Sequence, residues 1–355
     1  MSPSKGNEVE DPERKAKELA RQLALAVGPE AREGFIRLFS PLELGKYRLS
    51  NATRNPERDM YVQRVLEQLD ASGPWRRSSF PEDTLEKLEQ LKPKVGNFAH
   101  VVERVIDAIS LSLRYRKPIQ ITPILVVGEP GIGKSYFSHL FAESLGVPLR
   151  RIPMDNLQAG ASLAGSASIY LNSEAGTVFK VLTLENHISP VIILDEIDKA
   201  DGGSTYSDPL GPLHNLLEPG SARFFEDASC DLRIDASHVI WIATANHLDK
   251  IPATIRSRFE VFEIRSHSHG GRLGILKGIC EELSREYCGA EFEEELVGEL
   301  MERTPREQNQ MLRRALARAS RLGESRVTIA HLEQTTSEKY GRAGGRSIGF
   351  RGLAG

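Results

Sequence analysis

A glycine-rich loop between an apolar run and an amphipathic helical pattern is the first candidate for chemistry in this sequence. The loop and its nearest flanks comprise Gly128, Glu129, Pro130, Gly131, Ile132, Gly133, Lys134, Ser135 and Tyr136, which fit the pattern G-x-x-x-x-G-K-[ST]. Glycines let backbone N–H groups converge on phosphate oxygens, and the N-terminus of the following helix adds a positive dipole end. The pattern predicts that Lys134 contacts the outer phosphates of ATP and that the Ser135 hydroxyl holds Mg²⁺.

Two adjacent carboxylates follow a second apolar run, about 60 residues further along the chain. The run Val191–Leu194 is short enough for a buried strand, and it ends in Asp195 and Glu196. We expect Asp195 to hold Mg²⁺ together with Ser135. We expect Glu196 to polarise the water that attacks the γ-phosphate, and Asp198 to act as a structural cap or pairing partner.

A third apolar run leads to an amide, and two arginines follow it. Asn246 is predicted to share the attacking water with Glu196 and to report the loss of the γ-phosphate. Arg256 and Arg258 stand just before a further strand-like run. In this order of motifs an arginine is expected to stabilise transition-state charge on a neighbouring copy's γ-phosphate, as arginine fingers do. Arg258 is the first candidate and Arg256 the second, and action on a neighbour implies a closed ring.

The elements that must position these side chains form an α/β pattern. Short runs that are apolar on both faces, separated by helical patterns, predict a parallel sheet covered by helices on both sides. The expected strands are Ile121–Val127, Pro148–Ile152, Pro190–Leu194, Ser237–Thr244 and Glu260–Ile264.

Four zones are expected along the chain. Residues 1–92 are predicted to form short helices broken by turns, and residues 93–265 are predicted to form the α/β nucleotide-binding domain. Residues 266–340 are helical throughout and predict a small lid subdomain. Residues 341–355 form a glycine-rich tail.

Composition narrows the class of protein. The chain has 355 residues and a net charge of −3, so no overall basic field attracts nucleic acid. Its three cysteines are far apart and include no C-x-x-C pair, which favours a reducing compartment. There is no apolar run of the roughly 20 residues that a membrane span needs, and no signal-peptide core at the N-terminus. A cytoplasmic protein is expected.

The ordered set of motifs resembles the AAA+ ATPases, and several stretches resemble the ATPase portion of the Lon protease family. These are Leu66-Glu-Gln-Leu69 with Gly73-Pro-Trp75, Val101-Val-Glu-Arg-Val-Ile106, Gly165 to Gly176, Leu194 to Lys199, and Ile251-Pro-Ala253. The resemblance spans about residues 65 to 322. It implies a P-loop AAA+ sheet flanked by helices, with an N-terminal helical segment and a C-terminal helical lid.

The resemblance also implies partners and a grip on substrate. Tyr170 and Leu171 match the aromatic–aliphatic pair of Lon's substrate-gripping loop, and Tyr206 is a second candidate aromatic. The implied assembly is a homo-oligomeric ring, a hexamer, that uses ATP to unfold or remodel a polypeptide, as a chaperone does. A separate peptidase or an adaptor is a further partner that the resemblance leaves open.

The sequence departs from the family in two places. Lon's serine–lysine peptidase domain would follow the lid, whereas this sequence ends at Gly355, so ATPase activity without peptidase activity is expected. Gln310 stands where the family places a nucleotide-sensing arginine, and Arg313 or Arg314 is an alternative for that role.

Two other functions remain open at this point. AAA+ relatives also move or load nucleic acid, although the near-neutral charge and the Tyr-Leu loop favour a polypeptide. A nucleotide-dependent switch or scaffold would be favoured if Gln310 uncouples turnover from lid movement.

Overall fold

A computed structural model gives the fold, and it describes residues 14, 17, 18, 21, 33–50, 56–156, 159–166, 174–200, 208–265 and 269–332. The chain divides into two compact units. The larger takes its residues from Met1–Lys92, Phe98–Gly128 and Lys134–Ile264, and the smaller from Pro93–Asn97, Glu129–Gly133 and Arg265–Gly355. Along the described part of the chain, no helix combines the length and the apolar character that crossing a bilayer requires.

A five-stranded parallel sheet forms the centre of the larger unit. Its strand order is β4-β5-β8-β3-β9, and every neighbouring pair is parallel. The strands are β3 (Ile124–Gly128), β4 (Leu149–Pro153), β5 (Val191–Asp195), β8 (Ile240–Ala245) and β9 (Glu260–Ile264). The predicted α/β class with a parallel sheet is therefore confirmed.

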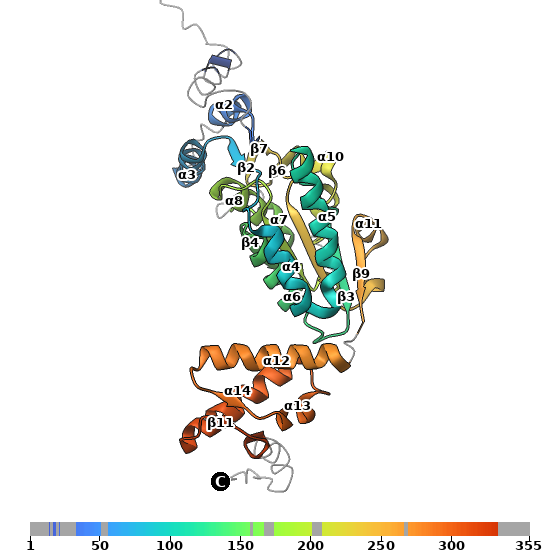
Figure 1. The fold of residues 1–355 in the computed structure, drawn as a ribbon. Coiled ribbons are helices and arrows are strands. Elements are labelled where there is room, and N and C mark those ends of the chain that lie inside the picture. The colour runs from blue at the N-terminus through green and yellow to red at the C-terminus, as the bar shows by residue number, and fades with distance from the viewer. Residues whose placement is uncertain are drawn as a thin grey trace, which may run out of the picture. The chain divides into compact units, whose positions relative to one another are not determined.

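The three central strands, β3, β5 and β8, are buried on both faces because helices cover both sides of the sheet. Side chains alternate along a strand, so Leu125 and Ile192 join the core on one face, while Ile124 and Ile193, also buried, point to the other. Figure 1 shows α4, α5 and α6 lying over one face. These are α4 (Thr84–Val95), α5 (Ala99–Tyr115), which follows the 3-10 turn η1 (Gly96–Phe98), and α6 (Lys134–Leu145).

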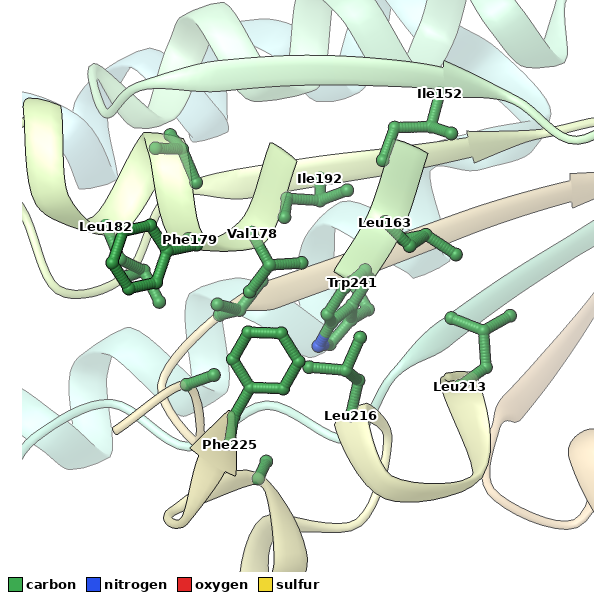
Figure 2. Packing of buried hydrophobic residues seen from close by; sticks show 14 of the residues in the cluster. Ile152, Leu163, Val178, Phe179, Leu182, Ile192, Leu213, Leu216, Phe225 and Trp241 are labelled. Atoms are coloured by element: carbon green, nitrogen blue, oxygen red, sulfur yellow. The ribbon is translucent and has the colours of Figure 1, made fainter. Parts of the chain in front are cut away.

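Short helices and a hairpin cover the opposite face. Figure 2 shows Val178, Leu163 and Leu216 gathered around Trp241, with Phe225 beside them. Fully burying a side chain of this size contributes about 1.5–3 kcal/mol. The elements are α7 (Ala159–Ala164), α8 (Thr177–Leu184), α9 (Leu213–Leu216), α10 (Pro219–Ala222), β6 (Phe225–Asp227) and β7 (Cys230–Ile234). The antiparallel pair β6–β7 was not predicted from the sequence.

The N-terminal region contains strands as well as helices. β1 (Phe35–Arg37) pairs antiparallel with β2 (Trp75–Arg77), and between them lie α2 (Pro41–Ser50) and α3 (Pro56–Ser72). Leu38, Tyr47 and Leu69 are buried in the same core as the sheet. The region is thus part of the larger unit's packing.

A buried arginine holds this region to α8. Arg76 is 1% exposed, and its guanidinium donates to the carbonyl oxygens of Leu182 at 2.7 Å and Thr183 at 3.0 Å. The same group donates to the carbonyl of Gly73 at 2.8 Å. Burial lowers the pKa of Arg76 to about 10, so it remains charged at neutral pH. The positive charge lies at the C-terminus of α8, where helix carbonyls lack intrahelical partners.

The smaller unit is mainly helical, as predicted for the lid. It contains α12 (His269–Glu286), α13 (Glu295–Leu300) and α14 (Pro305–Leu322), around a core that includes Leu283 and Leu312. Thr304 and Glu307 form a capping box at the start of α14, with backbone-to-side-chain bonds of 3.3 and 3.0 Å. A parallel pair of two-residue strands, β10 (Glu291–Phe292) and β11 (Arg326–Val327), is an addition to the prediction. Residues 329–332 are helical, and the rest of the predicted lid, residues 333–340, lies outside the described residues.

Candidate functional site

The candidate site lies where β3, β5 and β8 end, at one edge of the parallel sheet. In open α/β sheets ligands bind outside the carboxyl ends of the strands. β3 leads into the glycine-rich loop, β5 ends at Asp195, and Asn246 directly follows β8. The topology therefore brings together three sequence motifs, of which the first and the last are 112 residues apart at Lys134 and Asn246.

The glycine-rich loop adopts the backbone that a phosphate cradle requires. Gly131 has φ +82° and Gly133 has φ +101°, a region that residues with a Cβ rarely enter. A Cβ added at Gly133 would meet no atom within 4 Å, so the loop is open on that side. The N-terminus of α6 begins at Lys134, directly after the loop. This local geometry fits a chain of phosphates.

Lys134 is held between the loop and β8. Its Nζ donates to the carbonyl of Gly128 at 2.7 Å and to Oδ1 of Asn246 at 2.7 Å. Burial lowers the pKa of Lys134, and the negative charges of Asp198, Asp195 and Glu196 oppose that shift. Since a lysine can only donate, Oδ1 of Asn246 must face it, which leaves the amide Nδ2 as the group that can donate elsewhere.

The two residues expected to hold Mg²⁺ are adjacent. Ser135 Oγ donates to Oδ1 of Asp195 at 3.1 Å. Burial alone would raise the pKa of Asp195, but hydrogen bonds from Thr244, Arg151 and Ser135 hold it below its ordinary value. The carboxylate is therefore charged at neutral pH. A hydroxyl and a carboxylate oxygen side by side are donors that suit Mg²⁺, which takes its remaining ligands from water and substrate phosphates.

Glu196 follows Asp195 in a left-handed conformation, with φ 58° and ψ 48°. Its carboxylate is partly exposed and pairs with Lys199 at 2.8 Å. Asp198 is buried in the next turn, η2 (Ile197–Lys199), where its Oδ2 accepts from the backbone N–H groups of Asn246 and His247 at 3.1 and 3.0 Å. This contact agrees with the structural role predicted for Asp198.

Arg256 and Arg258 are placed apart from this cluster. Arg256 ends the short helix α11 (Ala253–Arg256), which follows the 3-10 turn η3 (Leu248–Lys250) and precedes the edge strand β9. The Arg258 guanidinium donates to the carbonyl of Thr254, while its buried Nε has no partner. Within the described ranges, neither arginine forms an ion pair or a hydrogen bond with Lys134, Asp195 or Glu196.

The residues predicted for the substrate loops and for the lid sensor are considered next. Tyr170, Leu171 and Tyr206 lie outside the described residues. The residues on either side of Tyr170 and Leu171 are described: the Ser166 N–H donates to the Glu174 carbonyl at 3.1 Å, so these two flanking residues lie together. Tyr136 is exposed, as are Gln310 and Arg314.

Arg313, the other candidate for the lid sensor, is already engaged within the lid. Its guanidinium donates to both carboxylate oxygens of Glu286, at 2.6 and 3.0 Å, and lies 5.9 Å from the centre of the Tyr287 ring. These contacts join α14 to α12.

Two residues at the site, and one that contacts the backbone before α8, were not predicted from the sequence. Arg151 of β4 forms an ion pair with Asp195, and Thr244 contacts both Asp195 and Glu196. Asp227 of β6 is 2% exposed and accepts from the Gly176 N–H at 2.7 Å, which fixes the backbone just before α8. Of these three residues, only Thr244 stood out in the sequence, as a polar residue within an otherwise apolar strand.

Comparison with known proteins finds sequence similarity over the segment that contains this site. Residues 124–266 match the family described as "ATPase family associated with various cellular activities (AAA)". Lon protease of Chloroflexus aggregans is 30% identical over 223 residues, 61% of this chain and 26% of that protein. Lon protease of Helicobacter pylori is 32% identical over 224 residues, with the same two coverages. A variant of Thermotoga maritima RuvB superposes with a TM-score of 0.48 at 16% identity, over 67% of this chain and 69% of that one.

The match covers only part of each Lon protease. The chain spans about a quarter of the length of these curated relatives, 26% of each. The matched part contains the loop, the two carboxylates and the amide described above. Residues 124–266 therefore match an ATPase domain of the AAA family, and the sequence is similar to the ATPase region of Lon proteases.

Proposed function

We propose that the chain hydrolyses ATP with Mg²⁺ in a ring of identical copies and uses the energy to unfold or remodel a polypeptide, without peptidase activity of its own. The observation that carries the proposal is the convergence of Lys134, Ser135, Asp195 and Asn246 on one edge of the sheet, through hydrogen bonds of 2.7 to 3.1 Å. We further propose a cytoplasmic hexamer, the assembly implied by the resemblance to Lon.

Each residue of the cluster has a distinct part in hydrolysis. The N–H groups of residues 129–133 and the Lys134 ammonium bind the phosphates. Bound Mg²⁺, held by Ser135 and Asp195, would neutralise charge on the phosphate oxygens. Glu196 takes a proton from the attacking water, and the Nδ2 donor of Asn246 orients that water against the γ-phosphate.

An arginine from a neighbouring copy completes the site in this proposal. Arg258 has no acidic partner within the described residues, and its own copy's site lies beyond hydrogen-bonding reach. A guanidinium that reaches across an interface would stabilise charge on the equatorial oxygens of the γ-phosphate in the transition state. Arg256 is the alternative donor.

Polypeptide is the substrate class that we favour. The 167–173 loop carries Tyr170 and Leu171, an aromatic and an aliphatic side chain that would grip an extended chain with little regard for sequence. Two contacts fix the flanks of this loop: the Ser166–Glu174 backbone bond and the Asp227–Gly176 bond. The fixed flanks connect the loop to β6 and α8, in the same unit as Asp195.

The first prediction separates nucleotide binding from hydrolysis. Lys134→Ala should lose ATP binding because the ammonium charge is removed, whereas Glu196→Gln should bind ATP and lose hydrolysis by on the order of 10²–10⁴-fold, the usual contribution of a general base. Fluorescent-nucleotide titration and phosphate release measure the two effects. Lys87→Ala, at an exposed lysine, and Glu185→Gln, at a partly exposed glutamate, are matched controls that should behave as wild type. An active Glu196→Gln protein would show that another group is the base.

The second prediction concerns action between copies. Arg258→Ala should keep ATP affinity and lose turnover by roughly 10³-fold or more. Mixing it with Lys134→Ala protein should recover part of the activity, because some interfaces then combine an intact nucleotide site with an intact arginine. Arg256→Ala, tested in the same way, shows which arginine acts. Wild-type specific activity that stays constant on dilution to the monomer would exclude action in trans.

The third prediction concerns the substrate. Tyr170→Ala should leave basal ATPase activity largely intact while abolishing its stimulation by an unfolded protein, since the loop is proposed to touch the polypeptide and not the nucleotide. Tyr115→Ala, at a tyrosine 60% exposed on α5, is the control. Stimulation that survives in Tyr170→Ala, or stimulation of the wild type by DNA instead of unfolded protein, would rule out this role.

A further inference from the structure

The hydroxyl of Thr244 lies between the two carboxylate residues of the site. Thr244 belongs to β8 and is 1% exposed. Its Oγ1 accepts from the backbone N–H of Glu196 at 3.0 Å and donates to Oδ1 of Asp195 at 2.5 Å. An N–H can only donate and an ionised carboxylate can only accept, so the direction of both hydrogen bonds is fixed.

The bond to Glu196 restrains an unusual backbone. Glu196 has φ 58°, and the left-handed region is unfavourable for any residue with a Cβ. Such a conformation persists only where the surroundings determine it, and it occurs preferentially at functional sites. The Thr244 hydroxyl is the partner of the Glu196 N–H, so it helps to set the direction in which the Glu196 side chain leaves the strand.

A second contact joins the ends of β5 and β8 without involving Asp195 or Glu196. Asp198 accepts from the N–H groups of Asn246 and His247, both just beyond β8. The Thr244 side chain of β8 thus contacts the residues at the end of β5. The Asp198 side chain, which follows β5, contacts the residues at the end of β8. Because the two contacts use different groups, one can be removed while the other serves as an internal reference.

We propose that Thr244 is a positioning residue for hydrolysis, whose hydroxyl holds Glu196 and Asp195 at a fixed separation so that base and Mg²⁺ ligand act on the same phosphate. The proposal rests on the ATPase function proposed above. It assigns no contact between Thr244 and ATP. The phosphates are bound by the loop and by Lys134, which Thr244 does not touch, so the effect of its loss should fall on turnover.

The matched variants are Thr244→Val and Thr244→Ser. Valine keeps the branched shape suited to a central strand and removes the hydroxyl, while serine keeps the hydroxyl and removes a methyl group. We expect Thr244→Val to lower kcat on the order of 10²-fold, the effect of a misplaced catalytic group, with the Kd for ATP within about threefold of wild type. Thr244→Ser should recover most of the turnover.

Amide hydrogen exchange gives a readout that does not depend on activity. In Thr244→Val the Glu196 N–H loses its acceptor and should exchange at least about tenfold faster than in wild type, while the amides of Asn246 and His247 remain protected by Asp198. In Thr244→Ser all three should exchange as in wild type. Residue-resolved exchange by NMR or fragmentation mass spectrometry measures this directly.

Several results would overturn the proposal. One is a Thr244→Val protein with wild-type kcat, another is an equal loss of turnover in the valine and serine variants, and a third is an unchanged Glu196 exchange rate. A fall in ATP affinity as large as the fall in kcat would place Thr244 in binding and also contradict it. Wild-type protein that binds ATP without hydrolysing it would instead count against the proposed ATPase function, and the exchange experiment would still decide whether Thr244 holds Glu196.

Discussion

A carboxylate that is buried and still charged is the constraint on which this structure depends. Asp195 is 5% exposed, and burial of an uncompensated charge is strongly unfavourable. Ser135, Thr244 and Arg151 all donate to it, from α6, β8 and β4 respectively. Two strands and one helix must therefore be correctly placed around Asp195 for the charge to be tolerated, and the same arrangement places Lys134 against Asn246.

That arrangement explains why the sheet order matters for the chemistry. β8 lies between β5 and β3, so residues at its end contact the carboxylates on one side and the P-loop lysine on the other. Asn246 and Thr244 are two residues apart and so lie on the same side of the strand. We propose that loss of the γ-phosphate near Lys134 is transmitted through Asn246, whose N–H donates to Asp198, to the turn that follows Glu196.

The sequence predicted the parts of the fold that come from long, strongly patterned segments. All five strands of the parallel sheet lie close to the predicted ranges, because runs such as Val191–Leu194 are buried on both faces. The P-loop and the carboxylates were predictable because their chemistry requires fixed residue types at fixed spacing. β1, β2, β6 and β7 were not, since each has only three to five residues and mixes apolar with charged side chains.

The contacts that complete the site depend on partners distant in sequence. In the sequence Gly73-Pro-Trp-Arg-Arg77, Arg76 would be predicted to lie on the surface. Its partners, the carbonyl groups of α8, are brought to it only by folding. Arg151 reads the same way, yet it faces Asp195, 44 residues further along the chain. Thr244 looks like an ordinary strand residue until its two partners are seen. These roles arise from three-dimensional packing, which local patterns do not contain.

The most direct measurement of the central claim is phosphate release by the purified wild-type chain at saturating ATP while Mg²⁺ is titrated from zero. If Ser135 and Asp195 form a site shared with the phosphates, release should be absent in excess chelator and should rise to saturation with Mg²⁺. Phosphate release that is equal with and without Mg²⁺, or that never exceeds the buffer background, would contradict the account of this edge of the sheet as an ATP hydrolysis site.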